Sequence, residues 1–389
     1  MKLKVLPEDF VVEELSDFPI TNKGDYNVYK LEKRYWNTLD ALEYLARKNN
    51  LNFSAISYGG KKDRYATTSQ FLTVFQNKLD LQTGYENLKL TFLGTAKEPF
   101  KPNYIKSNRF QIVIRDLSQS DIDDIQKNFY NLKKLGFPNY FGEQRFGSFD
   151  ERCGFFAEKF LKAQYNGAVK AALCSIFPQD KGSDKERKEL FFQHWGDFDF
   201  CLKHAKTRLE KSIFTVLKNH PKKFLDAIHS LPTTDVSMYF AAYQSYLWNK
   251  MLDKILSQRI KDSLYMIRIK NWRLTSFKLL KSDDQLYLKA LKIPTHGLNP
   301  YFCNDDVEVI YDETLKEEGL HQGRFNFRHY RKVIIKSFQR DAIVFPENSF
   351  ISKPERDEIY NGKLKIKLSF ELPRGSFATT LIKHLINQE

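Results

Sequence analysis

The chain has 389 residues, and 62 Lys and Arg against 48 Asp and Glu give it a formal net charge of +14. Hydrophobic residues make up 42% and aromatic residues 15% of the sequence, which excludes extended disorder and provides core material for two or three domains. No apolar run approaches the roughly 20 residues of a membrane span, so we expect no membrane association.

The four cysteines are far apart and show no C-x-x-C spacing: Cys153, Cys174, Cys201 and Cys303. This pattern argues against a disulfide framework or a structural zinc site. The first ten residues contain two acids and no apolar segment, so we expect no signal peptide. Together these observations predict a cytoplasmic protein.

Positive charge is spread along the whole chain. Basic and acidic side chains number 22 and 18 in residues 1–148, 28 and 23 in residues 149–324, and 12 and 7 in residues 325–389. A distributed excess fits a broad surface along a phosphate backbone better than a basic arm. On charge alone, a nucleic-acid partner and an ordinary basic protein are equally good interpretations.

In the first part of the chain, the sequence predicts both strands and helices. Strands are predicted at residues 10–15, 70–76 and 109–115. Residues 36–46 place leucines at helical spacing, with Asn37 and Asp40 as a start signal. Ser118, followed by acids, is typical of the N-cap of a second helix.

The middle of the chain is mostly helical by its periodicity, notably at residues 155–163 and 238–256, and residues 179–187 predict a surface loop. Residues 363–372 alternate strictly between apolar and polar, which predicts a strand of an antiparallel or mixed sheet with one face in solvent. A closing helix is expected at residues 377–386. This order predicts an α+β sheet built from both chain ends, with a helical insertion between them.

Asp63 is the first candidate for chemistry. It stands among Lys61, Lys62 and Arg64, just after two glycines. Nearby cations favour the ionised carboxylate that a nucleophile or base needs at neutral pH, and glycines let the backbone approach a ligand. A charged turn between a helix and a strand is the alternative interpretation, and from the residues alone it is the more frequent one.

Residues 138–147 combine rings, an amide and a guanidinium in a way that suits RNA. The candidate contacts are Asn139, Tyr140, Gln144 and Arg145. Aromatic rings stack on bases, while Arg and Gln bind phosphates and base edges. A structural turn anchored by its aromatic residues explains the segment equally well.

Residues 323–332 interleave basic residues with rings, among them Arg328 and Arg331. On a helix, Arg324, Arg328 and Lys332 would form one positive stripe for nucleic acid, although solvated helix faces often look the same. Near the end of the chain, Ser376 is a candidate helix cap. Phe377 either projects from the first turn of that helix toward a ligand or packs in the core.

Other chemistries find little support. The sequence has no H-E-x-x-H or zinc-deaminase pattern, no phosphate-binding loop of the G-x-x-x-x-G-K-[ST] type and no G-x-S-x-G elbow. The acids Asp121, Asp123 and Asp124 could suggest a two-metal nuclease, but their position at a helix start favours capping.

Several of these segments together resemble the TruD family of tRNA pseudouridine synthases, whose bacterial members isomerise the uridine at position 13 in the D-arm of tRNA. The matching motifs occur in the family's order and frame both ends of the chain: Lys4-Val-Leu-Pro-Glu-Asp-Phe10-Val-Val-Glu-Glu, Gly60-Lys-Lys-Asp63-Arg-Tyr-Ala66-Thr-Thr68-Ser-Gln70, Asn108-Arg-Phe110, Asn139-Tyr-Phe-Gly-Glu-Gln-Arg-Phe-Gly147 and Gly375-Ser-Phe377-Ala-Thr.

The resemblance implies a pseudouridine-synthase-like catalytic domain with a bent mixed or antiparallel sheet, built from residues 1–148 and 325–389. It implies a mostly helical α/β TRUD domain inserted at residues 149–324, with tRNA bound in the cleft between the domains. It also implies an isomerase that uses no cofactor, no metal and no obligate protein partner.

The resemblance further assigns roles to residues. Asp63 would be the catalytic carboxylate, which either adds to the sugar or takes a proton from it. The positions expected around the uridine and the carboxylate are Phe10, Asn108, Phe377, Phe110 as the ring that stacks on the target base, and the basic residues Lys4 and Lys62. A non-catalytic RNA-binding or RNA-remodelling protein is the main alternative, and a metal-dependent nuclease is a weaker one.

Overall fold

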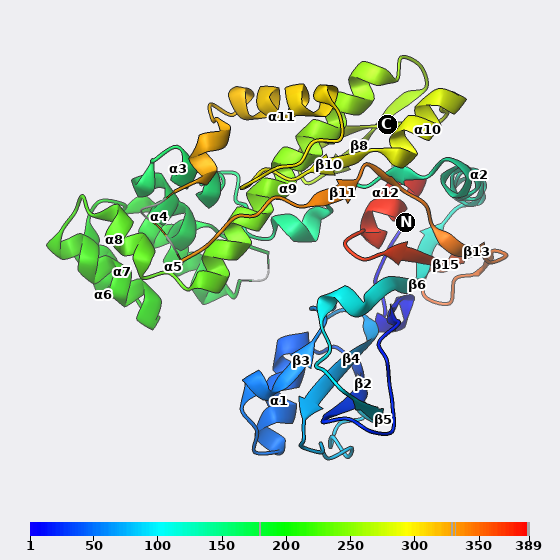
Figure 1. The fold of residues 1–389 in the computed structure, drawn as a ribbon, viewed down its shortest axis with the longest axis horizontal. Helices are drawn as coiled ribbons and strands as arrows, with labels where there is room; N and C mark the ends of the chain where they lie inside the picture. Colours follow the sequence, from blue (N-terminus) through cyan, green and yellow to red (C-terminus); the bar gives the residue numbers. More distant parts are fainter. Residues whose placement is uncertain (179, 328–329, 331, 387–389) are drawn as a thin grey trace. The chain divides into compact units, whose positions relative to one another are not determined.

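The computed structural model describes residues 1–178, 180–327, 330 and 332–386, and it divides the chain into two compact units (Figure 1). Unit 1 joins Met1–Phe137 to the segment that begins at Val344, and unit 2 is Pro138–Ile343. None of the described helices combines the length and the apolar character that crossing a bilayer requires.

The boundaries between the units differ from the predicted ones. They fall after residues 137 and 343, whereas the sequence predicted them after residues 148 and 324. At the first boundary, the buried side chain of Tyr140 donates a hydrogen bond to the carbonyl oxygen of Thr275 (2.8 Å), which ties residues 138–147 to unit 2. At the second, β11 (Gln339–Asp341) pairs with β10 (Lys292–Pro294) of the same unit.

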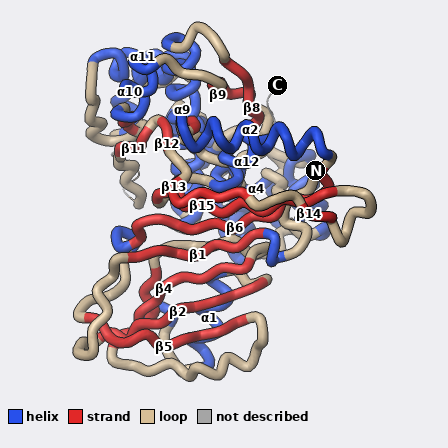
Figure 2. The backbone as a smooth tube through the Cα atoms, turned by 90° about the vertical axis from the view of Figure 1, so that its right-hand side faces the viewer, coloured by secondary structure: helices blue, strands red, loops and turns tan. Residues whose placement is uncertain are grey.

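The described part of unit 1 contains a nine-stranded mixed sheet in the order β13-β15-β6-β1-β4-β2-β5, with β14 beside β15 and β3 beside β4 (Figure 2). The strands are β1 (Phe10–Ser16), β2 (Tyr26–Arg34), β3 (Ile56–Tyr58), β4 (Thr67–Phe75), β5 (Leu88–Ala96), β6 (Ile105–Leu117), β13 (Glu347–Ile351), β14 (Glu355–Arg356) and β15 (Leu364–Pro373). Strands β1 and β4 are parallel, and the other recorded pairs are antiparallel. Because β15 lies beside β6, both chain ends build one sheet, and the predicted α+β class is confirmed.

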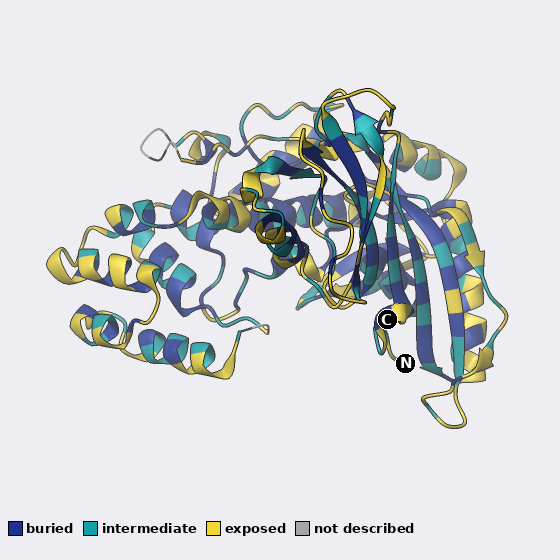
Figure 3. Cartoon of the chain, turned by 90° about the horizontal axis from the view of Figure 1, so that it is seen from below, coloured by how far each residue is buried: buried dark blue, intermediate teal, exposed yellow. Residues whose placement is uncertain are grey.

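Figure 3 shows buried and more exposed residues following one another along the strands of the sheet. On β6 and β15 this alternation separates a packed face from a more polar face. On β15, Ile366, Leu368, Phe370 and Leu372 are all buried, as their spacing predicted. On the polar face, Arg109 of β6 is in register with Glu13 and Glu371 on its two neighbouring strands and forms ion pairs with both. Opposite charges in register across strands stabilise such a face.

Helices cover the packed face of the sheet at both ends. Helix α1 (Thr38–Lys48) packs on β2 and β4, while α2 (Gln119–Leu135) and α12 (Ala378–Ile386) pack on β1, β6 and β15. Both helix layers cover the same face of the sheet. Strand pairing aligns the inward-facing residues of β6, β1, β4 and β2 with one another, from the strands that contact α2 to the strands that contact α1. The predicted cap Ser118 begins α2.

Unit 2 is mostly helical with short strands, as the sequence predicted. Besides β10, β11 and a few shorter elements, it contains α3 (Phe156–Leu161), α4 (Tyr165–Cys174), α5 (Gly182–Gln193), α6 (Phe198–His204), α7 (Arg208–Asn219), α8 (Phe224–His229), α9 (Thr233–Arg259), β8 (Leu264–Ile269), β9 (Trp272–Phe277), α10 (Ser282–Ala290) and α11 (Asp305–Glu317). The predicted helix at residues 238–256 lies within α9.

One prediction for unit 2 is wrong. Residues 182–187 belong to helix α5 and not to a loop, because Arg187 is buried and forms ion pairs with Asp184 and with Glu210 of α7. Of the stripe proposed at residues 324–332, Arg324 lies in a short 3-10 turn, Gln322–Phe325. Arg328 and Arg331 lie outside the described residues.

Candidate active site

The loop that carries Asp63 connects β3 to β4 in unit 1. Two side chains hold its backbone: Gln70 Nε2 of β4 donates to the carbonyl oxygen of Gly60 (3.0 Å), and the Lys62 amide donates to Oγ1 of Thr38, the first residue of α1 (2.9 Å). A Cβ atom at Gly59 would lie 2.5 Å from the side chain of Ile105, so this position requires glycine. The motif places Gly60 in the loop and Gln70 ten residues later on β4, where its side chain binds the backbone of that loop.

Lys33 of β2 supports the same loop and is almost fully buried. Its Nζ donates hydrogen bonds to the carbonyl oxygens of Trp36 (2.8 Å), Asp63 (2.8 Å) and Lys62 (3.4 Å). Burial lowers the pKa of Lys33 to about 8, while the charge of Asp63 acts in the opposite direction and that of Lys62 lowers it further. A buried ammonium group thus binds the backbone of the loop directly beneath the carboxylate.

Lys4 approaches the Asp63 carboxylate from the N-terminal segment. Its Nζ lies 2.6 Å from Asp63 Oδ2, and both side chains are about one quarter exposed, at 24% and 27%. The same ammonium group lies 4.1 Å from the ring centre of Phe10. Lys4 has a left-handed backbone with φ 54°, a strained conformation for a lysine that persists where surrounding contacts hold it. The ammonium group of Lys4 therefore contacts both the carboxylate of Asp63 and the ring of Phe10.

Lys62 points to the other side of the loop and binds two strand residues. Its Nζ lies 2.9 Å from Glu14 Oε2 and 2.5 Å from Asn108 Oδ1. Glu14 of β1 and Asn108 of β6 are partners in register, and the Glu14 side chain is fully buried. The second oxygen of Glu14 accepts a hydrogen bond from the amide of Phe71 (3.0 Å), so the acid orients both Lys62 and the strand beside it.

Aromatic rings line the sheet next to these charges. Phe10 meets Phe110 edge to face, with ring centres 6.3 Å apart, and Phe110 stacks on Phe370 at 5.5 Å. Phe377 is half-buried just before α12, where the chain turns after β15. The structure therefore gathers Asp63, Lys4, Lys62, Phe10, Asn108 and Phe110 in one place, and it sets Phe377 on the segment that leads into a helix covering the same face.

The predicted RNA contacts in residues 138–147 are only partly exposed. Tyr140 is fully buried with its hydroxyl bonded inside unit 2, and Asn139 is buried and accepts hydrogen bonds from Arg340. These two predictions are corrected: both residues hold the turn together, as the structural alternative expected. Gln144 is exposed and Arg145 is half-buried, with its Nε donating to Ser245 Oγ (3.0 Å).

Lys33 and Glu14 were missed as site residues in the sequence. A signal for both is present, because each takes an inward-facing place in an alternating strand: Lys33 follows Tyr29 and Leu31, and Glu14 follows Phe10 and Val12. A charged residue at an inward position of a strand needs a partner, and here the partner is the Asp63 loop.

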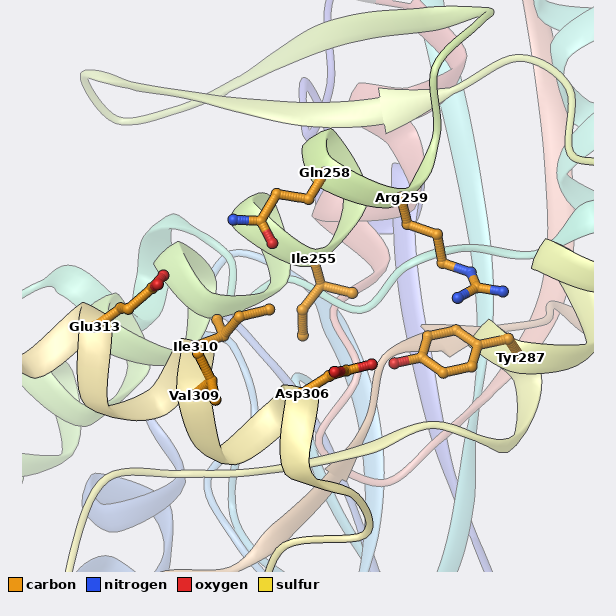
Figure 4. Close-up of a pocket in the computed structure, with 8 residues that line it drawn as sticks. All are labelled: Ile255, Gln258, Arg259, Tyr287, Asp306, Val309, Ile310 and Glu313. Carbon is orange, nitrogen blue, oxygen red and sulfur yellow. The ribbon is translucent and has the colours of Figure 1, made fainter.

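A hollow lies in unit 2 between α9, α10 and α11 (Figure 4). Arg259 at its edge forms an ion pair with Asp284 and covers the ring of Tyr287 at 3.8 Å. The charge of Arg259 is thus paired, and Glu313 on the lining lies 3.7 Å from Lys254, so the hollow suggests no chemistry. Within the described residues, no group of three or more His, Cys, Asp or Glu side chains is arranged to hold a metal ion.

Comparisons with known proteins agree with the motifs. Residues 1–385 match the sequence model of the family described as tRNA pseudouridine synthase D (TruD). The tRNA pseudouridine synthase D of Leptospira interrogans is 31% identical over 393 residues, covering 99% of this chain and 95% of the relative. A relative from Methanocaldococcus jannaschii, named "Probable tRNA pseudouridine synthase D 2", is 35% identical over 392 residues, covering 98% and 91%.

The fold agrees as well. A crystal structure from Methanosarcina mazei, described under the name tRNA pseudouridine synthase D (TruD), superimposes with a TM-score of 0.72 at 24% identity, covering 99% of this chain and 93% of that one. At this identity the likeness shows the fold alone. The sequence matches, however, extend over nearly the whole chain, so the chain belongs to the tRNA pseudouridine synthase D (TruD) family.

Proposed function

We propose that this chain converts the uridine at position 13 of tRNA to pseudouridine and that Asp63 is its catalytic carboxylate. Isomerisation of a tRNA uridine is the activity of the family to which the chain belongs. The observation that carries the assignment of Asp63 is its carboxylate, 2.6 Å from Lys4 Nζ, beside Phe10 and on a loop whose backbone is bound by buried side chains.

The reaction breaks the bond between C1′ of the ribose and N1 of uracil, turns the uracil in place and joins its C5 to C1′. C5 loses its proton to solvent and N1 takes up a proton, so the product is an isomer of the substrate. Asp63 acts either by adding to C1′ or by taking a proton from the sugar, and both routes need an ionised carboxylate at a fixed position. The ammonium group of Lys4, 2.6 Å from Asp63 Oδ2, helps to hold the carboxylate in that position.

The remaining groups suit a uracil that has left the base stack. Phe10, Phe110 and Phe377 offer apolar walls, and Asn108, oriented by Lys62, offers an amide for the edge of the base. Charges around the site bind the neighbouring phosphates. We assign the protein to the cytoplasm, where its four free cysteines suit a reducing compartment.

The test is Asp63→Asn, assayed by tritium release from tRNA that carries 5-tritiated uridine. The substitution keeps the shape of the side chain and removes the charge, so we expect a loss of activity of at least about 1000-fold. Asp123→Asn on α2 is the matched control and should act like the wild type. Activity of Asp63→Asn near the wild-type level would remove the assignment.

Two further readouts separate the alternatives. A non-catalytic RNA-binding protein predicts that cells with Asp63→Asn behave like the wild type and contain no pseudouridine at the target position. A metal-dependent nuclease predicts RNA cleavage that a chelator abolishes, whereas isomerisation should continue in the chelator.

A further inference from the structure

Two exposed tyrosines lie beside the Asp63 loop. Tyr65, two residues after Asp63, is 61% exposed, and Tyr35, directly after β2, is 48% exposed. Their ring centres are 6.4 Å apart and their planes meet at 84°. The two rings therefore form the walls of an open corner at the surface of unit 1, next to the candidate active site.

The residues on either side of Tyr35 hold it in place. Before it, the amide of Arg34 donates to the carbonyl oxygen of Asn87 (2.9 Å), and after it Trp36 Nε1 donates to Asn87 Oδ1 (3.1 Å). Tyr35 itself has φ 63°, a left-handed backbone conformation that is strained for a residue other than glycine. Strain of this kind is maintained where the surroundings fix the backbone, and it gathers at binding and catalytic sites.

The corner is also fixed relative to the carboxylate. Lys33, two residues before Tyr35, binds the carbonyl oxygen of Asp63 at 2.8 Å, and Tyr65 leaves the same loop two residues later. A ligand seated on the rings would therefore lie at a constant place relative to Asp63.

The charges near the corner match a nucleic acid. The guanidinium carbon of Arg64 lies 5.6 Å from the ring centre of Tyr65, and the side chain of Arg64 is exposed. Lys61, at the start of the loop, is exposed too. Rings next to exposed cations are the arrangement with which proteins bind unstacked nucleotides: the ring stacks on the base and the cation meets the phosphate.

We propose that Tyr35 and Tyr65 form a stacking site for a nucleobase that neighbours the target uridine in tRNA. The proposal rests on the proposed function. When the target uridine leaves the stack, its neighbour loses a stacking partner, and a fixed aromatic ring replaces that partner. A base stacked on one ring meets the edge of the other, which is the favourable contact between perpendicular rings. Because every base has a π face, the site accepts any base.

Binding of RNA tests the site without turnover. In the Asp63→Asn background, the affinity for tRNA is measured by fluorescence anisotropy for Tyr65→Ala and for Tyr35→Gly, which removes the ring and suits the positive φ. Each should weaken binding by about 10-fold at an unchanged melting temperature. Tyr65→Phe should bind within about two-fold of its parent, since the ring is kept. Tyr130→Ala, at a tyrosine of α2 that is 69% exposed, is the matched control and should leave binding unchanged.

The neighbouring base is identified with RNA that lacks a base on one side of the target uridine or on the other. On the RNA that lacks the stacked base, Tyr65→Ala should no longer weaken binding, because the interaction is already absent. Equal losses on intact and on both abasic RNAs would overturn the proposal, as would affinities of Tyr65→Ala and Tyr35→Gly within two-fold of their parent. Tritium release by the wild type decides the proposed function separately.

Discussion

Lys33 is 2% exposed, although lysine is among the residues that are least often fully buried. Its aliphatic chain lies on the packed face of the sheet. Its ammonium group donates hydrogen bonds to three backbone carbonyl oxygens, those of Trp36, Lys62 and Asp63. An apolar residue would fill the space but would leave those oxygens without a donor. We infer that Lys33 is a positioning residue, which acts on the reaction by fixing the backbone of the catalytic loop.

The variant Lys33→Met keeps the length of the side chain and removes its donors. Each buried oxygen that loses its partner costs about 1–3 kcal/mol, and the loop moves to reach water. We expect kcat to fall by about 100-fold, because displacements on the order of 1 Å have this effect on positioned groups. Any rise in the KM for tRNA should be smaller than the fall in kcat, since Lys33 is buried beneath the loop and does not itself contact RNA. A fall in stability with unchanged kcat would show that the residue is only structural.

The pH dependence of stability checks the same residue. The pKa of Lys33 is about 8 in the folded state and about 10.4 in an unfolded chain, so between these pH values the unfolded state binds more protons. The contribution of Lys33 to the free energy of unfolding therefore rises with pH across this window. The difference between wild type and Lys33→Met, measured by urea unfolding, should grow by an amount on the order of 3 kcal/mol between about pH 7.5 and pH 10.5. A constant difference would contradict the lowered pKa.

Part of this site was predictable from the residues and part was not. The two glycines and the cations around Asp63 marked the loop as a candidate because they are neighbours in the sequence. The contacts of Lys62 with Glu14 and Asn108 depend on which residues of β1 and β6 face each other. Alternation gives the face of each strand but not the register between strands, so these partners could not be predicted.

At the scale of the element, strands with strict alternation and helices with a clear start were predicted well. Residues 363–372 and 118 onward are examples. Helix α5 was mistaken for a loop because its first residues are Gly, Ser, Asp and Lys, a composition typical of loops. Its stabilising contacts are tertiary: the buried Arg187 reaches Glu210, and Phe191 packs on Phe214. Packing of this kind overrides propensity and is not visible in a local window.

The start of α2 offers a test of the local signal. Ser118 Oγ accepts a hydrogen bond from the amide of Asp121 (3.2 Å), and Asp121 Oδ2 accepts one from the amide of Ser118 (2.8 Å), which is a capping box. Ser118→Ala should lower the free energy of unfolding by about 1 kcal/mol. Ser120→Ala, two residues later in the first turn of the same helix and also exposed, should change it by less than about 0.5 kcal/mol. Chemical denaturation of both variants measures the difference, and equal effects would mean that the box contributes nothing.

At the scale of the molecule, one sheet is made from two ends of the chain that are more than 200 residues apart. Strand β15 lies beside β6, and Phe370 of the C-terminal segment stacks on Phe110. A buried ion cluster joins the same segments: Arg115 of β6 binds Asp9 through two nitrogens, and it lies 3.1 Å from Asp357. Asp9 directly precedes Phe10, so this cluster also supports the N-terminal segment of the candidate site.

Arg115 and Arg109 of the same strand form a matched pair for testing this connection. Each arginine has carboxylates on two neighbouring segments, but the side chain of Arg115 is 4% exposed and that of Arg109 is 43% exposed. Removing a buried partner leaves carboxylates without water or a counter-charge, which costs about 3–5 kcal/mol, whereas exposed pairs contribute about 0–1 kcal/mol. We therefore expect Arg115→Met to lower the free energy of unfolding by several times the effect of Arg109→Met.

The loss should also reach the reaction, because Asp9 and Phe10 are adjacent and Lys4 lies on the same segment. At a temperature where Arg115→Met remains folded, its kcat for tritium release should fall, while that of Arg109→Met should stay near the wild type. Urea unfolding and single-turnover kinetics on the two variants measure both effects. Equal stabilities would show that burial does not decide the strength of the cluster. A stability loss in Arg115→Met with unchanged kcat would show that the N-terminal segment keeps its place through the Lys4–Asp63 contact alone.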